Sequence, residues 1–311
     1  MKILITGGGG FIGSNLADRL LAAGHEVVTV DNYATSRRDN LAPQDRLTIV
    51  EDDIADEKLM ASHSEGADVV VHAAASYKDP DAWEEDARTN ALGTAVVVKA
   101  AERAGVKRFI YFQTALCYGV KPSEQPITLN HPLRPYESSY AISKTAGENY
   151  IRLSGLDWVS FRLANVYGPR NLSGPLPTFF SRLTQDKACF VTDTRRDFLF
   201  VTDLVDVVVK AIDGTGSGAY HVSSGADVSI KDLFDSTTAA LGLDRVDVEV
   251  RPRAADDAES ILLDPSKTES DFSWSTSVEL ADGVGQAIAW YQEHGIEQTY
   301  THLKEEELRV R

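Results

Sequence analysis

Thr6-Gly7-Gly8-Gly9-Gly10-Phe11-Ile12-Gly13 joins the first apolar run of the chain to its first helical stretch. Lys2–Thr6 is typical of a β-strand, and Phe11–Ala23 is typical of a helix. Gly7, Gly10 and Gly13 are spaced by three, which suits a tight turn, a close approach of a pyrophosphate and close helix–strand packing. The helix N-terminus would offer N–H groups and a partial positive charge to the phosphates. Because it lies between a strand and a helix, the turn predicts a dinucleotide-binding βαβ unit rather than a glycine-rich loop alone.

Strand-like and helix-like stretches alternate through the first half of the chain. Short apolar runs predict further strands at Glu26–Val30, Leu47–Val50, Asp68–His72, Arg108–Gln113 and Trp158–Leu163. Long helices are expected from about Glu84 to Ala104 and from about Ser139 to Ser154, each stopped by a glycine. This order predicts an α/β fold, a doubly wound parallel (Rossmann) sheet with helices on both faces.

The character of the sequence changes after Tyr167. Gly168-Pro169 and Gly174-Pro175-Leu176-Pro177 indicate loops, and the later elements are shorter. We therefore expect residues 1–167 to form the dinucleotide-binding domain, with some later segments returning to it. Residues 168–311 are expected to form a smaller substrate-binding lobe that ends in an exposed tail around Lys304-Glu305-Glu306-Glu307, after a last amphipathic helix from Gly283 to His294.

Composition argues against several classes of function. Lys and Arg number 31, and Asp and Glu number 47, so the formal net charge is −16. This balance opposes a nucleic-acid surface and attachment to anionic lipid, so neither nucleic acid nor membrane is expected as a partner. The two cysteines, Cys117 and Cys189, exclude a disulfide framework and cannot form a structural zinc site by themselves. The sequence shows no bilayer-length apolar run and no secretory leader, so we expect a cytoplasmic protein.

Asp31 ends the second predicted strand, about twenty residues beyond the glycines. A carboxylate there, followed by Asn32, can accept both ribose hydroxyls of adenosine and would repel a 2′-phosphate, which favours NAD over NADP. Arg37 and Arg38 either hold such a phosphate or are solvated loop charges, and we favour the second interpretation. Asp53-Ile54, after the third predicted strand, either flanks the adenine or forms a turn and a core contact.

Tyr140-Ala141-Ile142-Ser143-Lys144 places a phenol and an ammonium at positions i and i+4 of a predicted helix. Side chains at this spacing share one helix face. A nearby cation lowers the pKa of a tyrosine, so Tyr140 could remove a proton from a sugar or alcohol hydroxyl. Such pairs also occur by accident on helices, but this one follows the glycine turn and Asp31 in order, which favours a catalytic role.

In these motifs the chain resembles the extended short-chain dehydrogenases/reductases, specifically the nucleotide-sugar epimerases and dehydratases, over nearly its whole length. The other matching stretches are His72-Ala73-Ala74-Ala75, Asn90-Ala91-Leu92-Gly93-Thr94, Tyr118-Gly119, Phe161 to Arg170 and Arg196 to Val201. The stretch Gln113-Thr114-Ala115-Leu116-Cys117-Tyr118-Gly119 looks like the sugar 4-epimerases of bacterial surface-polysaccharide loci.

The resemblance implies roles for individual residues. Thr114 would hydrogen-bond the reacting oxygen, which we favour over an ordinary strand-end role. Asn165 and Arg196 would hold the substrate, and an arginine fork suits its diphosphate oxygens. A second arginine would be Arg253, unless the register places Ala254 or Ala255 there. The residues implied to contact NAD are Gly7, Gly10, Phe11, Ile12, Gly13, Asp31, Asn32, Asp53, Ile54, Ala73, Ala74, Ala75, Asn90, Tyr140 and Lys144.

The positions after Thr114 argue against some chemistries of the family. Members that dehydrate or decarboxylate their sugar resemble one another in carrying Asp or Glu there, whereas this chain has Ala115 and Leu116, which cannot move a proton. Cys117 could offer a thiol, but a small core residue is the better interpretation. His221 replaces a family Asn, and it either alters substrate contacts or, as we favour, is a satisfied buried histidine.

The resemblance therefore implies an NAD-dependent nucleotide-sugar 4-epimerase acting on a UDP-hexose, UDP-hexosamine or UDP-hexuronate. Tyr140 would take the 4-hydroxyl proton while hydride leaves C4 for NAD, and the 4-keto sugar would turn over before hydride returns to its other face. The alternatives are a dehydratase, decarboxylase or reductase of the same substrates, and a non-catalytic NAD-sensing protein. Family members usually form dimers through a four-helix bundle, so a homodimer built on the two long helices is expected.

Overall fold

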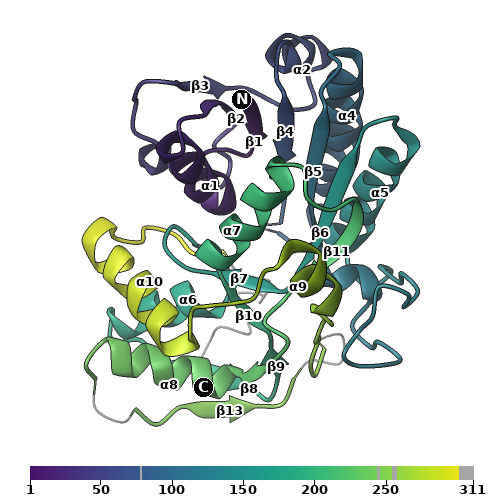
Figure 1. Cartoon of the computed structure of the whole chain (residues 1–311). Helices are drawn as coiled ribbons and strands as arrows, with labels where there is room; N and C mark the ends of the chain where they lie inside the picture. The colour runs from purple at the N-terminus through teal and green to yellow at the C-terminus, as the bar shows by residue number, and fades with distance from the viewer. Residues whose placement is uncertain (78, 244–245, 254–257, 301–311) are drawn as a thin grey trace.

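A parallel β-sheet forms the centre of the molecule (Figure 1). The structure is a computed structural model of the chain and describes residues 1–77, 79–243, 246–253 and 258–300. The sheet has seven strands, and all of their pairings are parallel. In spatial order they are β11 (Gly218–Val222), β6 (Trp158–Leu163), β5 (Arg108–Thr114), β4 (Val69–His72), β1 (Lys2–Thr6), β2 (Glu26–Asp31) and β3 (Leu47–Glu51). The predicted Rossmann-like fold is thereby confirmed.

Helices cover both faces of the sheet. On β1, Ile3 and Ile5 pack with α1 (Phe11–Ala22) and α7 (Val201–Ile212), whereas Leu4 between them packs on the opposite face. That opposite face is covered by α2 (Glu57–Ser64), α4 (Thr94–Arg103) and α5 (Ser139–Leu153). The two groups of helices lie on either side of the sheet in Figure 1. Burial on both faces explains why the central strands read as continuous apolar runs.

The strands predicted from the sequence agree with the structure to within one residue at each end. The long helix expected from about Glu84 to Ala104 is instead three consecutive segments, α3 (Trp83–Asp86), the π-helical η2 (Ala87–Gly93) and α4. A π-helical turn is wider than an α-helical one and often marks a functional position. Helix α2, which Asp56 caps through the backbone N–H groups of Lys58 and Leu59, was not predicted.

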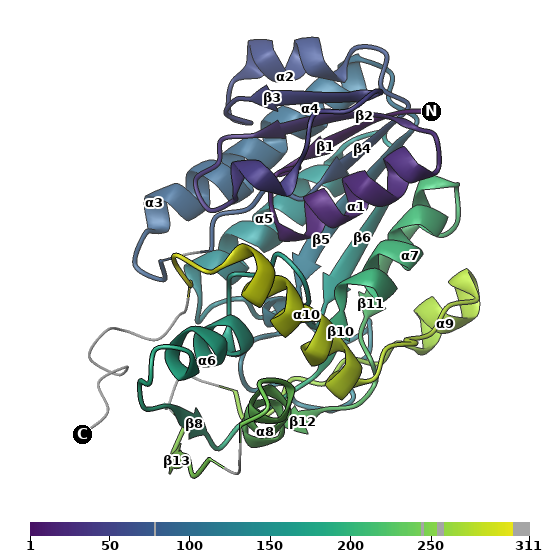
Figure 2. The ribbon, with the colours of Figure 1, turned by 90° about the vertical axis from the view of Figure 1, so that its left-hand side faces the viewer.

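Several elements after β6 build a second core beside the carboxyl ends of the strands (Figure 2). Phe179, Phe234 and Tyr291 lie in this core, which α6 (Pro175–Leu183), α8 (Ile230–Ala240) and α10 (Leu280–His294) share. Three two-stranded sheets border it: β7 (Asn165–Tyr167) with β10 (Phe198–Phe200), β9 (Arg195–Arg196) with β12 (Val228–Ser229), and β8 (Phe190–Thr192) with β13 (Glu249–Arg251). The remaining short elements are η1 (Arg38–Asn40), η3 (Ala115–Tyr118) and α9 (Ser266–Phe272).

One predicted loop is wrong. The stretch from Gly174 to Pro177 begins α6, because Gly174 adopts a φ of +91° just before the helix and Pro175 occupies its first position. Proline suits that position, since its missing N–H would have no partner inside the helix. Helix α10 begins at Leu280, ahead of the predicted Gly283. The predicted tail at Lys304-Glu305-Glu306-Glu307 lies outside the described residues.

The chain enters the central sheet twice. After β6 it forms β7 and α6, and it then returns through α7 to β11, which pairs with β6. The sheet thus includes residues from both sides of position 167, while the division into a dinucleotide-binding domain and a substrate lobe stays a prediction. Within the part of the chain that the structure describes, no helix is both long enough and apolar enough to span a bilayer.

Candidate active site

The glycine turn between β1 and α1 has the geometry of a phosphate cradle. Gly7 has a φ of +67°, and a Cβ there would meet the backbone nitrogen of Ala74 at 2.6 Å. A Cβ on Gly13 would collide with the carbonyl oxygen of Gly7, so α1 packs against the turn only because both residues lack one. Gly10 precedes α1 and has no side chain to cap it, which leaves the first-turn N–H groups available to an anion. These residues fit a dinucleotide pyrophosphate.

Asp31 lies at the end of β2 and faces the glycine turn. Its Oδ2 accepts a hydrogen bond from the backbone N–H of Gly9 (2.9 Å). Its Oδ1 accepts from the backbone of Tyr33 (2.7 Å) and from the Ser36 hydroxyl (2.8 Å). The carboxylate is therefore fixed beside the turn, where a ribose hydroxyl would share or replace the Ser36 contact. Asn32 is exposed, and its side chain accepts from the backbone of Ala34, which shapes the same loop.

Arg37 and Arg38 are not free loop charges. The Arg37 guanidinium pairs with Asp39 and donates to the carbonyl of Gly295 at 2.9 Å, beyond the end of α10. Arg38 pairs with Glu51 and lies 4.5 Å from the centre of the Tyr33 ring. Because both guanidinium groups already have acidic partners, neither is presented to a 2′-phosphate beside Asp31, which agrees with a preference for NAD.

Asp53 and Ile54 separate in the structure. The Asp53 carboxylate pairs with the Arg88 guanidinium at 2.6 Å, and Asp53 remains half-buried. Ile54 is buried in the core under α4, where a Cβ on Gly93 would strike its side chain at 2.7 Å. Of the two interpretations left open by the sequence, the structure shows the turn and the core contact: Asp53 accepts from the backbone N–H of Ala55 (2.8 Å), and Ile54 lies in the core. Contact with an adenine stays a prediction.

The loop after β4 lies against the glycine turn. The backbone N–H of Ala73 donates to the carbonyl of Thr6 (3.0 Å), and that of Ala74 lies 3.4 Å from the Thr6 hydroxyl oxygen. Asn90, in the π-helical segment η2, is fully buried and exchanges two hydrogen bonds with the backbone of Ser76 (2.9 and 3.0 Å). Its amide also donates to Ser143 of α5 (3.1 Å). Asn90 thus holds this loop against the helix that carries Tyr140, and it acts on the site by positioning.

Thr114, Tyr140 and Lys144 come from two elements that pack together. Thr114 is the last residue of β5, and its hydroxyl accepts from the backbone N–H of Leu116 (3.2 Å). Tyr140 and Lys144 lie on the first two turns of α5, which packs on β5 and on the η3 turn that follows it. Ser138 caps this helix through the N–H of Ala141 (3.3 Å). The predicted catalytic residues are therefore gathered at the carboxyl edge of the sheet.

Burial disfavours the charged forms of Tyr140 and Lys144. The pKa of Tyr140 is raised well above its usual range, first by burial and then by Tyr77 and Asp86. Burial lowers the pKa of Lys144 to about 7, against the opposing effect of Glu148. Lys144 Nζ lies 4.1 Å from the centre of the Tyr111 ring. Lys144 is not among the groups that shift the pKa of Tyr140 here, so the expectation that it lowers that pKa stays a prediction.

A buried polar network that the sequence did not reveal supports α5. Glu148, one turn after Lys144, pairs with Arg162 of β6 at 2.7 Å. Arg162 also donates to the Tyr118 hydroxyl (2.6 Å), which lies 2.6 Å from His221 Nε2. Burial lowers the pKa of His221 to about 4, and its Nδ1 lies 3.0 Å from the carbonyl of Asp264. His221 is thus the satisfied buried histidine that we favoured. The i, i+4 spacing from Lys144 is the signal that could have identified Glu148.

The residues predicted to hold substrate lie on neighbouring segments beside the second core. Asn165 is exposed at the start of β7, and its backbone N–H donates to the carbonyl of Asp197 (2.9 Å). Arg196, the residue before Asp197, donates to the carbonyl of Ala258 (2.9 Å). Arg253 pairs at 2.9 Å with Glu259, the residue that follows Ala258. The structure therefore places all three in one region, whereas Ala254 and Ala255 lie outside the described residues.

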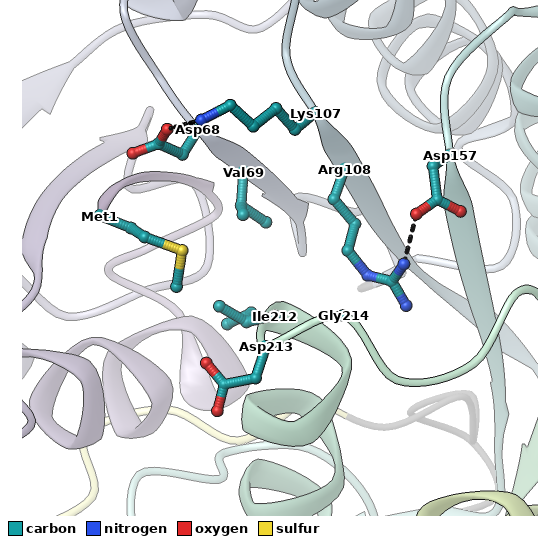
Figure 3. Close-up of a pocket in the computed structure, with 9 residues that line it drawn as sticks. All are labelled: Met1, Asp68, Val69, Lys107, Arg108, Asp157, Ile212, Asp213 and Gly214. Carbon is teal, nitrogen blue, oxygen red and sulfur yellow. Dashed lines mark hydrogen bonds and ion pairs between the residues drawn. The ribbon is translucent and has the colours of Figure 1, made fainter.

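A cavity of about 270 Å³ lies at the opposite end of the sheet (Figure 3). It is lined by Met1, Val69, Arg108 and Asp213, with Lys107 paired to Asp68 and Arg108 paired to Asp157 at its rim. Val69 and Arg108 begin their strands, whereas ligands of open α/β sheets bind beyond the carboxyl ends. This cavity is therefore not the dinucleotide site.

Comparison with known proteins relates the whole chain to sugar-nucleotide enzymes. A model described as the NAD dependent epimerase/dehydratase family matches residues 3–223. Bordetella bronchiseptica WbmH, solved with NAD+, is 53% identical with a TM-score of 0.91 over 95% of this chain and 99% of that one. WbmG of the same organism, solved with NAD and UDP, is 44% identical with a TM-score of 0.88 over 97% of each chain. A UDP-glucose 4-epimerase of Mycolicibacterium smegmatis is 33% identical over 94% of this chain and 99% of its own. More distant relatives include dTDP-glucose 4,6-dehydratases.

Proposed function

The chain belongs to the NAD-dependent epimerase/dehydratase family, and from that membership we propose that it is a nucleotide-sugar 4-epimerase acting on a UDP-hexose, UDP-hexosamine or UDP-hexuronate. Its cofactor is NAD, with which close structural neighbours are crystallised. Similar proteins solved with UDP or UDP-glucose support a uridine nucleotide as the substrate handle.

In the proposed reaction, Tyr140 takes the proton of the sugar 4-hydroxyl and Thr114 hydrogen-bonds the same oxygen. NAD, when bound, supplies the acceptor and donor for the hydrogen on C4 and brings a positive charge to the site. Lys144, which is buried on the next turn of α5, adds positive charge whenever it is protonated. Because burial raises the pKa of Tyr140, the phenolate depends on such positive charge for its stability. Tyr140 then returns the proton to the inverted alcohol.

Substrate holding is assigned to the second core. Arg196 and Arg253 would bind the diphosphate from adjoining segments, and Asn165 would bind beside them. Anchoring of the diphosphate at these residues lets the keto sugar rotate in the site without dissociating. Binding energy from the nucleotide, far from C4, then supports the reaction at C4.

The observation that carries the choice of epimerisation is the apolar η3 turn after Thr114. Ala115 is buried and Leu116 packs against the same cluster, so neither supplies the acid or base that loss of the 6-hydroxyl requires. Burial raises the pKa of the Cys117 thiol to about 12, so it does not supply a base either. Without an acid or base at residues 115–117, the site is suited to a reaction at C4 in which Tyr140 moves the proton.

Dehydration is the second candidate, because 4,6-dehydratases are among the relatives. One experiment separates the candidates: UDP-sugars are incubated with enzyme and NAD in deuterium oxide, and the products are followed by NMR. We expect inversion at C4 with no solvent deuterium in the sugar. Deuterium at C5 together with a 4-keto product would identify a dehydratase. When NADH is supplied in place of NAD, its stoichiometric consumption would identify a reductase.

A non-catalytic NAD-sensing protein is a third candidate. The presence of Thr114, Tyr140 and Lys144 at one edge of the sheet argues against it, since a sensor needs none of them. Absence of turnover on the whole UDP-sugar panel, with NAD bound, would favour the sensor. A cytoplasmic location and a role in surface-polysaccharide synthesis stay predictions.

We also propose that the protein is a homodimer built on η2 and α5. Four large apolar side chains are exposed on these neighbouring elements: Leu92 (51%), Ile142 (48%), Tyr150 (45%) and Leu153 (82%). Ile142, Tyr150 and Leu153 follow helical spacing and so share one stripe of α5. Pairing this stripe with a second copy would produce the expected four-helix bundle.

A further inference from the structure

The segment that follows α10, residues 295–300, is tied to the dinucleotide-binding part of the molecule at its first end. We call this segment the C-terminal strap. Arg37 donates to the carbonyls of His294 (3.3 Å) and Gly295 (2.9 Å), and its guanidinium lies 5.6 Å from the centre of the Trp290 ring. Arg37 belongs to the loop after β2, so the strap starts beside the loop that Asp31 shapes.

The other end of the strap is tied to two further loops. Tyr300 donates from its backbone N–H to the carbonyl of Leu172 (2.8 Å) and accepts from the backbone N–H of Gly174 (3.0 Å). The Tyr300 ring packs edge-on against Tyr77, with 6.5 Å between ring centres and 81° between ring planes. Tyr77 belongs to the loop after β4, directly beyond Ala73-Ala74-Ala75.

These anchors place the two ends of the strap at loops on either side of the glycine turn. In the sheet, β1 lies between β2 and β4, so the β2 loop and the β4 loop flank the turn that follows β1. Adjacent strands are about 4.8 Å apart, whereas six extended residues reach roughly 20 Å, so the strap is long enough to join the two loops. Figure 2 shows the yellow segment leaving α10 and running toward the loop before α3.

Tyr77 has partners on both sides of the dinucleotide site. Burial raises the pKa of Tyr77, whereas Thr35, in the same loop as Arg37, lowers it. Tyr77 also interacts electrostatically with Asp31 and with Tyr140. Tyr77 therefore lies near both Asp31, at the ribose end of the predicted dinucleotide site, and Tyr140, at its catalytic end.

We propose that Tyr77 and the strap residue Tyr300 form an aromatic clasp that closes over bound NAD and slows its release. Two tyrosines present apolar faces to a nucleotide while their hydroxyls stay near polar groups. The benefit of the clasp rests on the proposed function, because an epimerase that lost its reduced cofactor between the two hydrogen transfers would release a keto sugar. The clasp itself depends only on NAD and on the contacts described above.

The test measures nucleotide release without any sugar. Enzyme loaded with NADH is mixed with excess NAD, and the loss of bound NADH fluorescence gives the dissociation rate. We expect Tyr77→Ala, Tyr300→Ala and the double variant each to release NADH about tenfold faster than the parent chain. The double variant should exceed the single variants little, because either substitution removes the pair. Tyr136→Ala is the matched control, since Tyr136 is 74% exposed and lies outside these contacts.

Two truncations test the strap independently of the rings. A chain ending at His294 lacks the strap and should release NADH as fast as the double variant, whereas a chain ending at His302 keeps residues 295–300 and should behave like the parent.

Unchanged release in the double variant and in the shorter truncation, with thermal unfolding unaltered, would overturn the proposal. Faster capture of NADH with unchanged release would also overturn it, because the tyrosines would then obstruct the site. A parent chain that retains NADH yet epimerises no UDP-sugar would refute the proposed function and leave the clasp standing.

Discussion

Tyr140 and Lys144 lie in a site whose burial opposes the charged forms that the proposed reaction needs. Sequence spacing predicted their shared helix face but not their desolvation, which arises from the packing of α5 on β5. Substitution of Tyr140 should therefore lower the turnover rate, whereas substitution of Lys144 should raise the free energy of unfolding.

Tyr140→Phe keeps the ring and removes the proton-moving hydroxyl. We expect turnover of the UDP-sugar to fall about 10²- to 10⁴-fold, which is the usual contribution of a general base, while NAD content is retained. Product formation by NMR and bound nucleotide by absorbance measure the two effects. Tyr136→Phe, an exposed tyrosine on the same segment, serves as the control, and a fully active Tyr140→Phe variant would refute the assignment of the base.

Lys144→Met should stabilise the NAD-free protein in a pH-dependent way. Below pH 7 Lys144 is charged in both states, so the folded state carries the full cost of burying its charge. Between pH 7 and its ordinary pKa of 10.5, only the unfolded state keeps the proton, so the free energy of unfolding of the parent chain rises with pH. The variant should therefore be more stable by roughly 2–4 kcal/mol near pH 6 and by little near pH 10. Urea unfolding at the two pH values checks this, and an equal difference at both would contradict it.

Residue roles were predictable where chemistry and local spacing coincide. The turn from Gly7 to Gly13 and the pair Tyr140 and Lys144 are each local in sequence, so their geometry follows from one element. The pairing of Tyr77 with Tyr300 could not be predicted, because no periodicity connects two loops so far apart in the chain. The pKa of Tyr140 likewise depends on Asp86 and Tyr77, which approach it only in the folded structure.

Among the elements, the central strands were predicted best, whereas helices α2 and α6 were missed. Continuous apolar runs mark strands that are buried on both faces, and these agree within one residue. Helix α6 was mistaken for a loop because glycine followed by proline indicates both a turn and the first turn of a helix. The π-helical turn η2 leaves the general helical pattern intact, so the sequence between Trp83 and Arg103 gave no sign of it.

Helix α5 should also carry the interface between subunits. Replacing Tyr150 and Leu153 together by Glu would place charges on its exposed stripe, so we expect a dimer to become a monomer of 34.0 kDa. Multi-angle light scattering measures this mass. Leu243→Glu, at an exposed leucine after α8, is the matched control and should leave the mass unchanged. A parent chain that is itself monomeric, or a double variant that stays dimeric, would contradict the placement.

At the level of the whole molecule, the sheet is assembled from two separated parts of the chain. Strand β11 pairs with β6, and α7 covers the same core as α1. The sequence indicated that some later segments would return to the sheet, but it did not identify β11, because a short run such as Gly218–Val222 carries little periodicity.

Residues 1–167 alone should therefore fail to fold cooperatively. Such a fragment leaves the edge of β6 unpaired and exposes the apolar side chains that α7 covers. A fragment of residues 1–222 restores both and should regain a cooperative urea transition, measured by circular dichroism. A cooperative transition in the shorter fragment would show that β11 and α7 are dispensable for the sheet.

The contacts of Arg37 limit how this enzyme could be re-engineered to use NADP. Replacing Asp31 would remove a negative charge but would supply no cation for the extra phosphate, because Arg37 is held by Asp39 and Gly295 and Arg38 by Glu51. Recruiting Arg37 would detach the first anchor of the C-terminal strap. Selection for the phosphorylated coenzyme should therefore produce variants that exchange their coenzyme with the medium. Under the proposed function, such variants would depend on the cellular coenzyme pool instead of regenerating one bound molecule.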